Sequence, residues 1–321
     1  MAERLPVDLV TGFLGSGKTT LLSRLLGSPE LGETAVIVNE LGEVAIDHHL
    51  LRQVDERTVL LANGCLCCTL RGDLADELRD LLSRRTRGEI PPFRRVLVET
   101  TGLADPAPIL NTLLAEPVVR HHFEPGTVLA TVDALNGLGQ LEREVETVKQ
   151  VVVADRLVVT KTDVADPDTV AVLEERLHAL NPAADLLEVS FGEAEPAALL
   201  APVNGDPRGI RIPEAPRHAG DLHPFVLFLE GPVDWTAFGI WLTMLLQARG
   251  NDVLRVKGLL DAGGPGPVVL NGVQHVVHPP EHLDAWPDGD RRSRIVFIAR
   301  GIEKREIEES LAAFDTAARR R

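Results

Sequence analysis

All three cysteines of the chain lie within four positions, in the segment Asn63-Gly64-Cys65-Leu66-Cys67-Cys68. A lone free cysteine is usually a buried, inert residue. Three thiols this close together, just before a predicted helix, instead favour binding of a soft metal ion such as Zn²⁺, Co²⁺ or Cu⁺, because a helix N-terminus stabilises the thiolate form. Three sulfur ligands leave a fourth tetrahedral position for another protein group, for water or for a receiving protein. A redox pair is the alternative, although its usual spacing is CxxC.

A second segment has the residues of a phosphate-binding loop. It reads Gly12-Phe13-Leu14-Gly15-Ser16-Gly17-Lys18-Thr19-Thr20 and fits GxxxxGK[ST] between a predicted strand and a predicted helix. Glycines let successive N–H groups converge on phosphate oxygens, Lys18 can contact the β- and γ-phosphates, and Thr19 can complete a Mg²⁺ site. The other predicted nucleotide-binding residues of the loop are Gly12, Gly15, Ser16, Gly17 and Thr20. A dinucleotide-binding GxGxxG is the alternative, but it leaves the lysine unexplained.

Two further segments indicate hydrolysis of a guanine nucleotide. Glu99 ends an apolar segment, where an acid can hold Mg²⁺ through water, and the N–H of Gly102 can then meet the γ-phosphate. The segment Thr160-Lys161-Thr162-Asp163 is similar to the guanine-reading NKxD element. A carboxylate at Asp163 can accept two hydrogen bonds from guanine that adenine does not offer. Because Thr160 replaces the usual Asn, the preference for GTP over ATP depends on Asp163.

Short apolar segments rich in Val and Leu alternate with helical patterns over residues 1–200. Strands are predicted at 7–12, 34–40, 57–64, 94–100, 127–134 and 155–163, and helices at 18–26, 73–83, 140–154 and 169–180. Such alternation is typical of parallel βαβ units, because short continuous apolar strands are covered on both faces. The predicted fold is therefore α/β, a P-loop NTPase with a doubly wound, mostly parallel sheet.

A segment rich in proline and glycine at 201–220 is predicted to be a linker. It separates a nucleotide-binding domain at 1–200, which includes the three cysteines, from a smaller α+β domain at 221–321. The second domain is predicted to have an antiparallel sheet with helices on one face. Residues 273–278 are predicted to be one strand, which would place His275 and His278 on opposite faces because strand side chains alternate.

The composition limits the compartment and the partners. A formal net charge of −15 argues against nucleic acid or an anionic membrane as the main partner, because binding a polyanion needs a basic face. The sequence starts without a signal-peptide pattern, and no segment approaches the ~18 consecutive apolar residues of a membrane helix. Clustered free thiols suit a reducing compartment. We therefore expect a cytoplasmic protein.

Taken together, the motifs resemble those of the CobW-type metallochaperone GTPases, which are related to the nickel-insertion GTPases of urease and hydrogenase maturation. The segments that carry the resemblance are 12–20, 39–47, 64–68, 99–106, Gln150 with Ala154-Asp155, 160–163, 254–258, 272–275 and 290–297. They cover nearly the whole chain and occur in the order seen in that family. The resemblance implies a GTPase that uses GTP, GDP and Mg²⁺. It also implies that Zn²⁺ or Co²⁺ binds to Cys65, Cys67 and Cys68 and is delivered to a client metalloprotein.

The resemblance also implies roles that spacing alone would not indicate. Glu40 and Asp47 lie in a segment similar to the first switch, with Asp47 a candidate for the Mg²⁺ site and Glu40 the first candidate for the fourth transition-metal ligand. Glu99 and Gly102 would form the second switch. The hypothesis is that GTP and Mg²⁺ order both switches and close the metal site, and that hydrolysis loosens it.

No Gln or Arg is clearly placed by the sequence to position the attacking water. We therefore expect slow intrinsic hydrolysis that a partner, a metal ion or a homodimer accelerates. One alternative is a metal buffer or sensor in which hydrolysis is incidental. A small-molecule kinase with a structural metal is another, although no segment suggests a pocket for an acceptor substrate.

Overall fold

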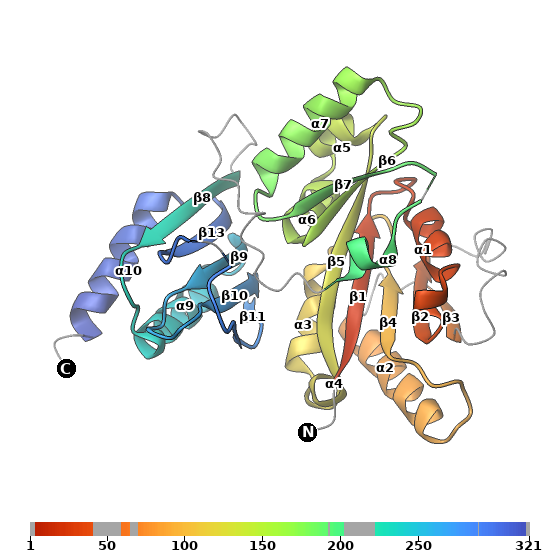
Figure 1. Cartoon of the computed structure of the whole chain (residues 1–321), viewed down its shortest axis with the longest axis horizontal. Helices are drawn as coiled ribbons and strands as arrows, with labels where there is room; N and C mark the ends of the chain where they lie inside the picture. Colours follow the sequence, from red (N-terminus) through yellow and green to blue (C-terminus); the bar gives the residue numbers. More distant parts are fainter. Residues whose placement is uncertain are drawn as a thin grey trace. The chain divides into compact units, whose positions relative to one another are not determined.

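The computed structural model describes residues 4–40, 59–64, 70–191, 193–201, 222–287 and 289–318. The chain divides into two compact units (Figure 1), one comprising Met1–Arg176 with Asp185–Pro202 and the other Leu177–Ala184 with Val203–Arg321. The predicted linker at 201–220 lies almost entirely outside the described residues. The domain boundaries at 1–200 and 221–321 therefore stay predictions.

The first unit is built on a seven-stranded sheet in which every adjacent pair of strands is parallel. The spatial order is β3-β2-β4-β1-β5-β6-β7. The strands are β1 (Leu5–Gly12), β2 (Thr34–Glu40), β3 (Val59–Gly64), β4 (Arg95–Glu99), β5 (Phe123–Asp133), β6 (Arg156–Thr160) and β7 (Asp185–Val189). This arrangement confirms the predicted doubly wound fold, with β7 an additional strand that the apolar pattern did not indicate.

Helices cover both faces of this sheet. Crossovers between parallel strands are right-handed, so the chain places α1 (Lys18–Leu26) on one face and α2 (Leu70–Thr86), α3 (Ala107–Ala115) and α6 (Val145–Val153) on the other. On the first face α1, η1 (Pro29–Leu31) and α8 (Pro196–Leu200) share one apolar cluster with the strands. Figure 1 shows α1 and α8 beside the sheet. Because the carboxyl ends of parallel strands meet at one edge, the loops that follow β1, β4, β5, β6 and β7 are neighbours there.

The remaining helices of this unit differ from the sequence prediction. A single helix was expected at 140–154, but α5 (Gly137–Arg143) and α6 are separate because Glu144 between them has extended backbone, with φ −110° and ψ 111°. Helix α3 and the short α4 (Pro117–His122) lie in a stretch for which no helix was predicted. Helix α7 (Pro167–Leu180) lies between β6 and β7 along the chain and confirms the helix expected at 169–180.

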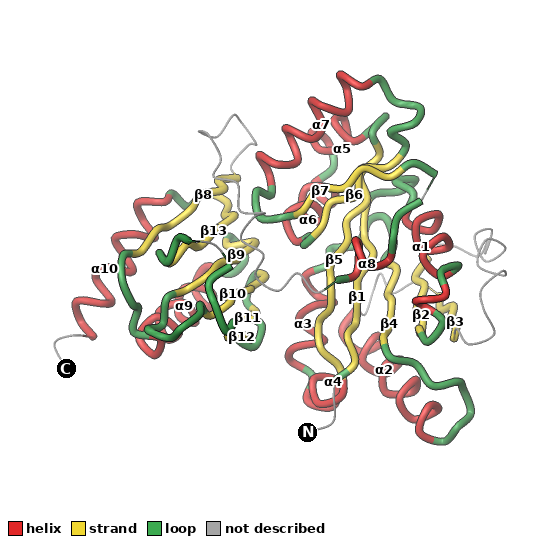
Figure 2. The backbone as a smooth tube through the Cα atoms, in the orientation of Figure 1, coloured by secondary structure: helices red, strands yellow, loops and turns green. Residues whose placement is uncertain are grey.

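The second unit contains an antiparallel sheet with two helices on one face (Figure 2), as predicted. Its strands are β8 (Leu222–Leu229), β9 (Val253–Leu260), β10 (Val268–Val273), β11 (Val276–Val277), β12 (Glu281–His282) and β13 (Ser293–Arg300). Helices α9 (Trp235–Arg249) and α10 (Lys304–Ala318) contribute to a single apolar cluster with the strands. In that cluster the rings of Phe225 and Phe297 stack with centroids 5.5 Å apart.

The prediction of one strand at 273–278 is wrong. Gln274 has φ 52°, and the chain reverses there so that β11 pairs with β10 as a hairpin. His275 lies in this turn, where Nδ1 is 2.8 Å from the Leu246 carbonyl oxygen and Nε2 is 3.0 Å from Oδ1 of Asn251. Both ring nitrogens of His275 therefore serve the fold.

No helix within the described ranges is long and apolar enough to cross a membrane.

Candidate functional site

The phosphate loop, residues 12–20, connects β1 to α1 and needs glycine at particular points. Gly12 has φ 138°, and a Cβ atom there would lie 2.3 Å from Oγ1 of Thr131 and 2.7 Å from Oγ of Ser16. Gly17 is the N-cap of α1 with φ 92°. Gly15 also has positive φ, 72°, but a Cβ there would meet nothing within 4 Å. The loop thus combines a left-handed backbone with close approach to β5, which only glycine permits at Gly12.

Lys18 is the first residue of α1, and its side chain turns back into the loop. Its Nζ donates to the carbonyl oxygens of Gly12 and Phe13, each at 3.0 Å, and the residue is 8% exposed. The ammonium group is therefore fixed over the loop where the predicted phosphates would bind. Phosphate oxygens would offer it charge-assisted bonds, which are stronger than bonds to neutral carbonyls.

Thr19 and Glu99 meet across the sheet edge. The hydroxyl of Thr19 donates to Oε1 of Glu99 at 2.6 Å, although the two residues are 80 positions apart, and Glu99 is 3% exposed at the end of β4. A hydroxyl and a carboxylate oxygen are ligands that Mg²⁺ accepts, together with phosphate oxygens and water. These two residues, which the sequence analysis assigned to Mg²⁺, fit that ion. Thr20, the last residue of the predicted set, is exposed on α1.

Hydroxyl groups of neighbouring strands hold the phosphate loop in place. Oγ of Ser16 is 2.6 Å from Oγ1 of Thr131 on β5, and that hydroxyl is 3.2 Å from the carbonyl oxygen of Thr11. The hydroxyl of Thr100 donates to Oγ1 of Thr11 at 2.9 Å. All four residues are buried. Short, uncharged side chains therefore support the loop on the side of β5 and β4.

Thr160, which stands where the guanine-reading pattern has Asn, is part of this support. Its hydroxyl donates to the carbonyl oxygen of Ser16 at 2.7 Å, and a Cβ at Gly17 would lie 3.5 Å from its methyl carbon. Thr160 is 6% exposed at the end of β6. A threonine hydroxyl is thus sufficient to tie this strand end to the phosphate loop, although it lacks an amide that could contact a base.

Lys161 follows with φ 60°, and its Nζ is 2.6 Å from Oδ2 of Asp133 at the end of β5. Asp133 is 2% exposed and also accepts bonds from the Leu135 N–H at 2.8 Å and the Asn136 amide at 3.0 Å. Burial by itself raises the pKa of Asp133, but the bonds from Lys161, Asn136 and Leu135 outweigh it and lower the pKa overall. A charged Asp133 therefore fixes the direction of the Lys161 side chain.

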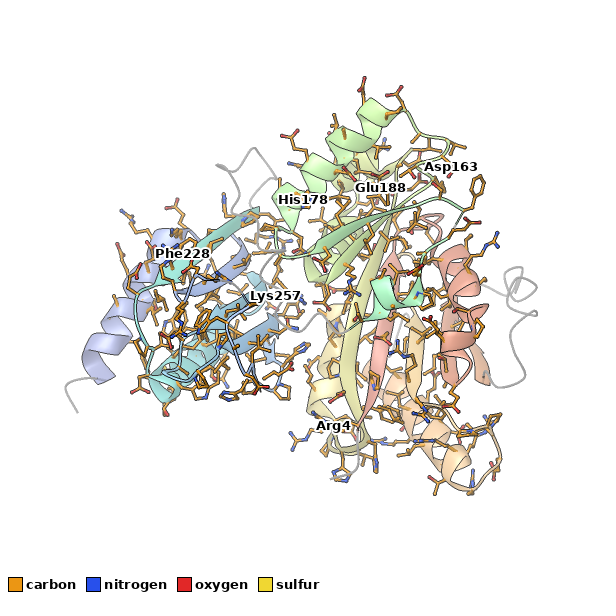
Figure 3. All side chains as sticks on the ribbon, in the orientation of Figure 1. Arg4, Asp163, His178, Glu188, Phe228 and Lys257 are labelled. Carbon is orange, nitrogen blue, oxygen red and sulfur yellow. The ribbon has the colours of Figure 1, made fainter. Side chains whose placement is uncertain are left out.

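Asp163, the predicted base-reading carboxylate, is exposed in the turn after β6 (Figure 3). Beside it, Oγ1 of Thr162 lies 3.0 Å from Oγ of Ser190, which follows β7. The turn that carries Asp163 is thus joined to the end of the next strand, and its carboxylate faces solvent, where a base can approach it.

Gly102 lies against the phosphate loop, as expected of a residue that senses the last phosphate. A Cβ at Gly102 would lie 2.6 Å from the backbone nitrogen of Leu14. Its carbonyl oxygen and that of Ala104 accept bonds from Nε2 of Gln150, each at 3.1 Å, and Gln150 is 1% exposed on α6. Nζ of Lys149 is 2.8 Å from Oδ2 of Asp105 in the same loop. Helix α6 therefore positions the loop that follows Glu99.

The side chains of the predicted transition-metal ligands lie outside the described residues. This holds for Cys65, Cys67, Cys68 and the side chain of Glu40, and also for Asp47, the other predicted Mg²⁺ residue. The backbone of β2 and β3 is described, and Glu40 pairs in register with Gly64, the residue before Cys65. In the remainder of the chain for which side chains are given, no three His, Cys, Asp or Glu residues gather as a metal site.

Sequence reasoning missed Thr131, Asp133 and the role of Gln150. Asp133 ends an apolar segment just as Glu99 does, and that position was a signal for a residue at the carboxyl edge of the sheet. Thr131 lies within a segment already predicted as a strand, so its hydroxyl gave no signal. Gln150 was noted only as part of the resemblance.

Comparisons with known proteins agree with this geometry. Residues 6–188 match the family described as CobW/HypB/UreG, nucleotide-binding domain, and residues 222–315 match the family described as cobalamin synthesis protein cobW C-terminal domain. The zinc chaperone YjiA of Escherichia coli (strain K12) is 34% identical over 319 residues, which cover 96% of this chain and 98% of the relative. The zinc chaperone CobW of Pseudomonas aeruginosa is 30% identical over 353 residues, covering 96% of this chain and 91% of the relative.

Among solved structures, the crystal structure of Zn(II)-bound YjiA GTPase from E. coli is similar to this chain with a TM-score of 0.72 and 29% sequence identity. The alignment covers 97% of this chain and 99% of that chain. These matches confirm the family resemblance that the motifs indicated.

Proposed function

Because the chain belongs to the CobW/HypB/UreG family, we propose that it is a GTP-hydrolysing metallochaperone. It binds a transition metal, Zn²⁺ before Co²⁺, at Cys65, Cys67 and Cys68, and delivers the metal to a client metalloprotein. The nucleotide state controls when the metal is held and when it is released.

The observation that carries the proposal is the bond of 2.6 Å between the Thr19 hydroxyl and the Glu99 carboxylate. It supports a Mg²⁺ position at the mouth of a phosphate loop whose Lys18 is already directed inward. Thr19 and Glu99 would hold the ion, and its positive charge would offset the negative charge of the β- and γ-phosphates. Lys18 would hold the same phosphates, and Gly102, positioned by Gln150, would contact the γ-phosphate.

The order of the strands supports coupling between nucleotide and metal. β3, which ends one residue before Cys65, lies three strands from β1, with β2 and β4 between them. At a strand spacing of about 4.8 Å, their carboxyl ends are roughly 14 Å apart. Glu40 ends β2 and Glu99 ends β4. Each of the two strands between the cysteine segment and the phosphate loop therefore ends in an acidic residue.

From this order we infer that Glu40 is the fourth metal ligand and that the segment after β2, with Asp47, reports the γ-phosphate to the metal site. A GTP-bound chain would hold Zn²⁺ tightly, and hydrolysis would weaken that binding. Thermodynamic linkage then requires Zn²⁺ to change GTP affinity by the same factor that GTP changes Zn²⁺ affinity.

Two measurements test the function. Phosphate release from GTP and Mg²⁺, with Zn²⁺ or Co²⁺ titrated in, tests hydrolysis, and we expect a slow basal rate that metal or a partner changes. Zn²⁺ affinity in the presence of GDP and of a non-hydrolysable GTP analogue tests coupling, and we expect tighter binding with the analogue. Equal affinities in the two states would favour the metal buffer or sensor.

Matched variants locate the metal site. Cys67→Ser and Glu40→Gln should weaken Zn²⁺ binding, whereas Glu30→Gln, which changes an exposed acid on η1, should not. Glu40→Gln should also reduce the difference in Zn²⁺ affinity between the two nucleotide states. If Glu40→Gln and Glu30→Gln bind Zn²⁺ equally well, Glu40 is not a ligand.

A further inference from the structure

Two strained residues lie side by side at the carboxyl edge of the first sheet. Within the described residues, three non-glycine residues have positive φ: Lys161 at 60°, Phe191 at 54° and Gln274 at 52°. Gln274 makes a hairpin turn in the second unit. Lys161 follows β6 and Phe191 comes shortly after β7, and these strands pair with Thr160 opposite Val189. Bulky residues rarely adopt such a backbone unless the surrounding structure enforces it, and such residues gather at functional sites.

Phe191 exposes its ring to solvent. It is 66% exposed, more than any other large hydrophobic residue in the described ranges, and Leu135 after β5 is 51% exposed at the same edge. Phe191 lies at the carboxyl edge of the sheet, which is where open parallel sheets bind their ligands. The ring therefore lies where a flat apolar group could cover it.

The surroundings of Phe191 indicate what that group is. The neighbouring Ser190 is joined to Thr162 at 3.0 Å, one residue from Asp163. Lys161 is held by Asp133 at 2.6 Å, so its aliphatic stem has a fixed direction. Thr160 contacts the phosphate loop through Ser16. A nucleotide whose phosphates occupy that loop therefore brings its base to this edge, next to Asp163.

We propose that Phe191 is an affinity-determining residue of the nucleotide site, stacking its ring on the purine base opposite the stem of Lys161. This inference rests on the proposed function, since it needs a nucleotide in the phosphate loop. Stacking on an aromatic ring is tolerant of base identity, because every base has a π-face. Phe191 would thus set how tightly a purine nucleotide binds, and Asp163 would set which purine is preferred.

The test is equilibrium binding of GTP, GDP, ATP and inorganic tripolyphosphate, each with Mg²⁺, to the full chain and to Phe191→Ala. We expect Phe191→Ala to weaken GTP, GDP and ATP binding by about 5- to 150-fold, the range that loss of one stacked base gives. Tripolyphosphate has no base, so its affinity should not change. The ratio of GTP to ATP affinity should also stay constant, whereas Asp163→Asn should lower it.

Two further variants and a control keep the test decisive. Phe191→Gly removes the ring while suiting the left-handed backbone, and it should lose nucleotide affinity as Phe191→Ala does. Phe191→Trp should restore affinity, with a change in indole fluorescence when GDP binds. Val172→Ala trims an exposed apolar residue on α7 and should leave binding unchanged.

The outcomes separate the inference from the function on which it rests. Unchanged GTP and GDP affinities in Phe191→Ala and Phe191→Gly would overturn the stacking role, and so would an equal loss for tripolyphosphate. An unmodified chain that binds neither GTP nor GDP would instead overturn the proposed function.

Discussion

Strand β1 carries two polar sites, one at its middle and one at its carboxyl end, and different chemistry holds the two. In the middle of the strand, Asp8 is 2% exposed, with Oδ2 at 3.3 Å from Nη1 of Arg95 and Oδ1 accepting a bond of 2.8 Å from the Thr127 N–H. Burial raises the pKa of Asp8 to about 6, although the Arg95 charge and the Thr127 N–H act in the opposite direction. The Asp8 site is therefore a buried ion pair between a carboxylate and the Arg95 guanidinium.

At the carboxyl end of β1, Gly12 begins a site in which hydroxyl groups and main-chain carbonyls form bonds. The Lys18 ammonium donates to the carbonyls of Gly12 and Phe13, and the Thr160 hydroxyl donates to that of Ser16. Neutral carbonyls are weaker acceptors than phosphate oxygens, so a nucleotide can replace them around Lys18 with a gain in bond strength.

The difference separates fold from function along one strand. A buried carboxylate with an arginine partner gains nothing from a ligand, and Asp8 can be assigned to the fold rather than to ligand binding. A lysine that rests on carbonyls, beside a hydroxyl and a carboxylate that suit Mg²⁺, is prepared for ligand exchange. Substitutions at the Asp8 site should therefore change stability alone, whereas substitutions at the phosphate loop should also change nucleotide binding. Three experiments test this difference.

The largest effect is expected for Gly12→Ala, with Gly15→Ala as its matched control. The new methyl group at Gly12 would lie 2.3 Å from Oγ1 of Thr131, whereas one at Gly15 meets nothing within 4 Å. Overpacking and backbone strain should together lower the free energy of unfolding of Gly12→Ala by about 2–6 kcal/mol and abolish GDP binding. Gly15→Ala should cost about 1–2 kcal/mol. Urea unfolding measures the stability of each variant, and GDP titration measures its nucleotide binding. Equal losses of stability in Gly12→Ala and Gly15→Ala would contradict the close contact of Gly12 with β5.

A pH-dependent effect of intermediate size is expected for Asp8→Asn. The pKa of Asp8 is raised from 3.8 to about 6 in the folded chain, so its contribution to stability is present below pH 3.8 and is lost as pH rises through 6. The full difference amounts to about 3 kcal/mol. Because asparagine does not titrate, the stability of Asp8→Asn relative to the unmodified chain should rise by up to that amount between pH 4 and pH 8.

Urea unfolding at these two pH values checks the prediction, with Glu30→Gln as the control at an exposed acid. A relative stability that stays constant or falls with pH would mean that Arg95, rather than burial, dominates the Asp8 site. GDP affinity should be unaffected by Asp8→Asn at pH 8, because Asp8 lies four residues before Gly12 on β1 and contacts Arg95 and Thr127 rather than the phosphate loop.

The sequence predicted the carboxyl-edge site better than the packing around it. Gly12 and Lys18 belong to a contiguous pattern that encodes one backbone path, and Glu99 could be recognised because it ends an apolar segment. Thr131 contacts the loop because of how β5 pairs with β1, and Asp133 contacts Lys161 because of how β5 pairs with β6. Register between strands that are distant in the sequence is not visible locally.

Two local errors have backbone causes. The break between α5 and α6 falls at Glu144, which is neither proline nor glycine, so the helical pattern continued through it. The hairpin at Gln274 uses positive φ in a residue that seldom adopts it, so the apolar pattern of 273–278 indicated a continuous strand.

The smallest effect is expected for Thr160→Val, with Thr160→Ser as its matched control. Valine keeps the shape of threonine but removes the hydroxyl that donates to the Ser16 carbonyl at 2.7 Å, whereas serine keeps that donor. Loss of this bond should lower the free energy of unfolding by about 0.5–1.5 kcal/mol and weaken GDP binding by about 2- to 10-fold, because the carbonyl side of the phosphate loop loses its tether. Thr160→Asn restores a donor and adds the amide of the guanine-reading pattern, so it should recover GDP affinity and raise the ratio of GTP to ATP affinity. If Thr160→Val binds GDP as tightly as Thr160→Ser, the hydroxyl bond is incidental, and the support of the loop must come from the Thr131 side alone.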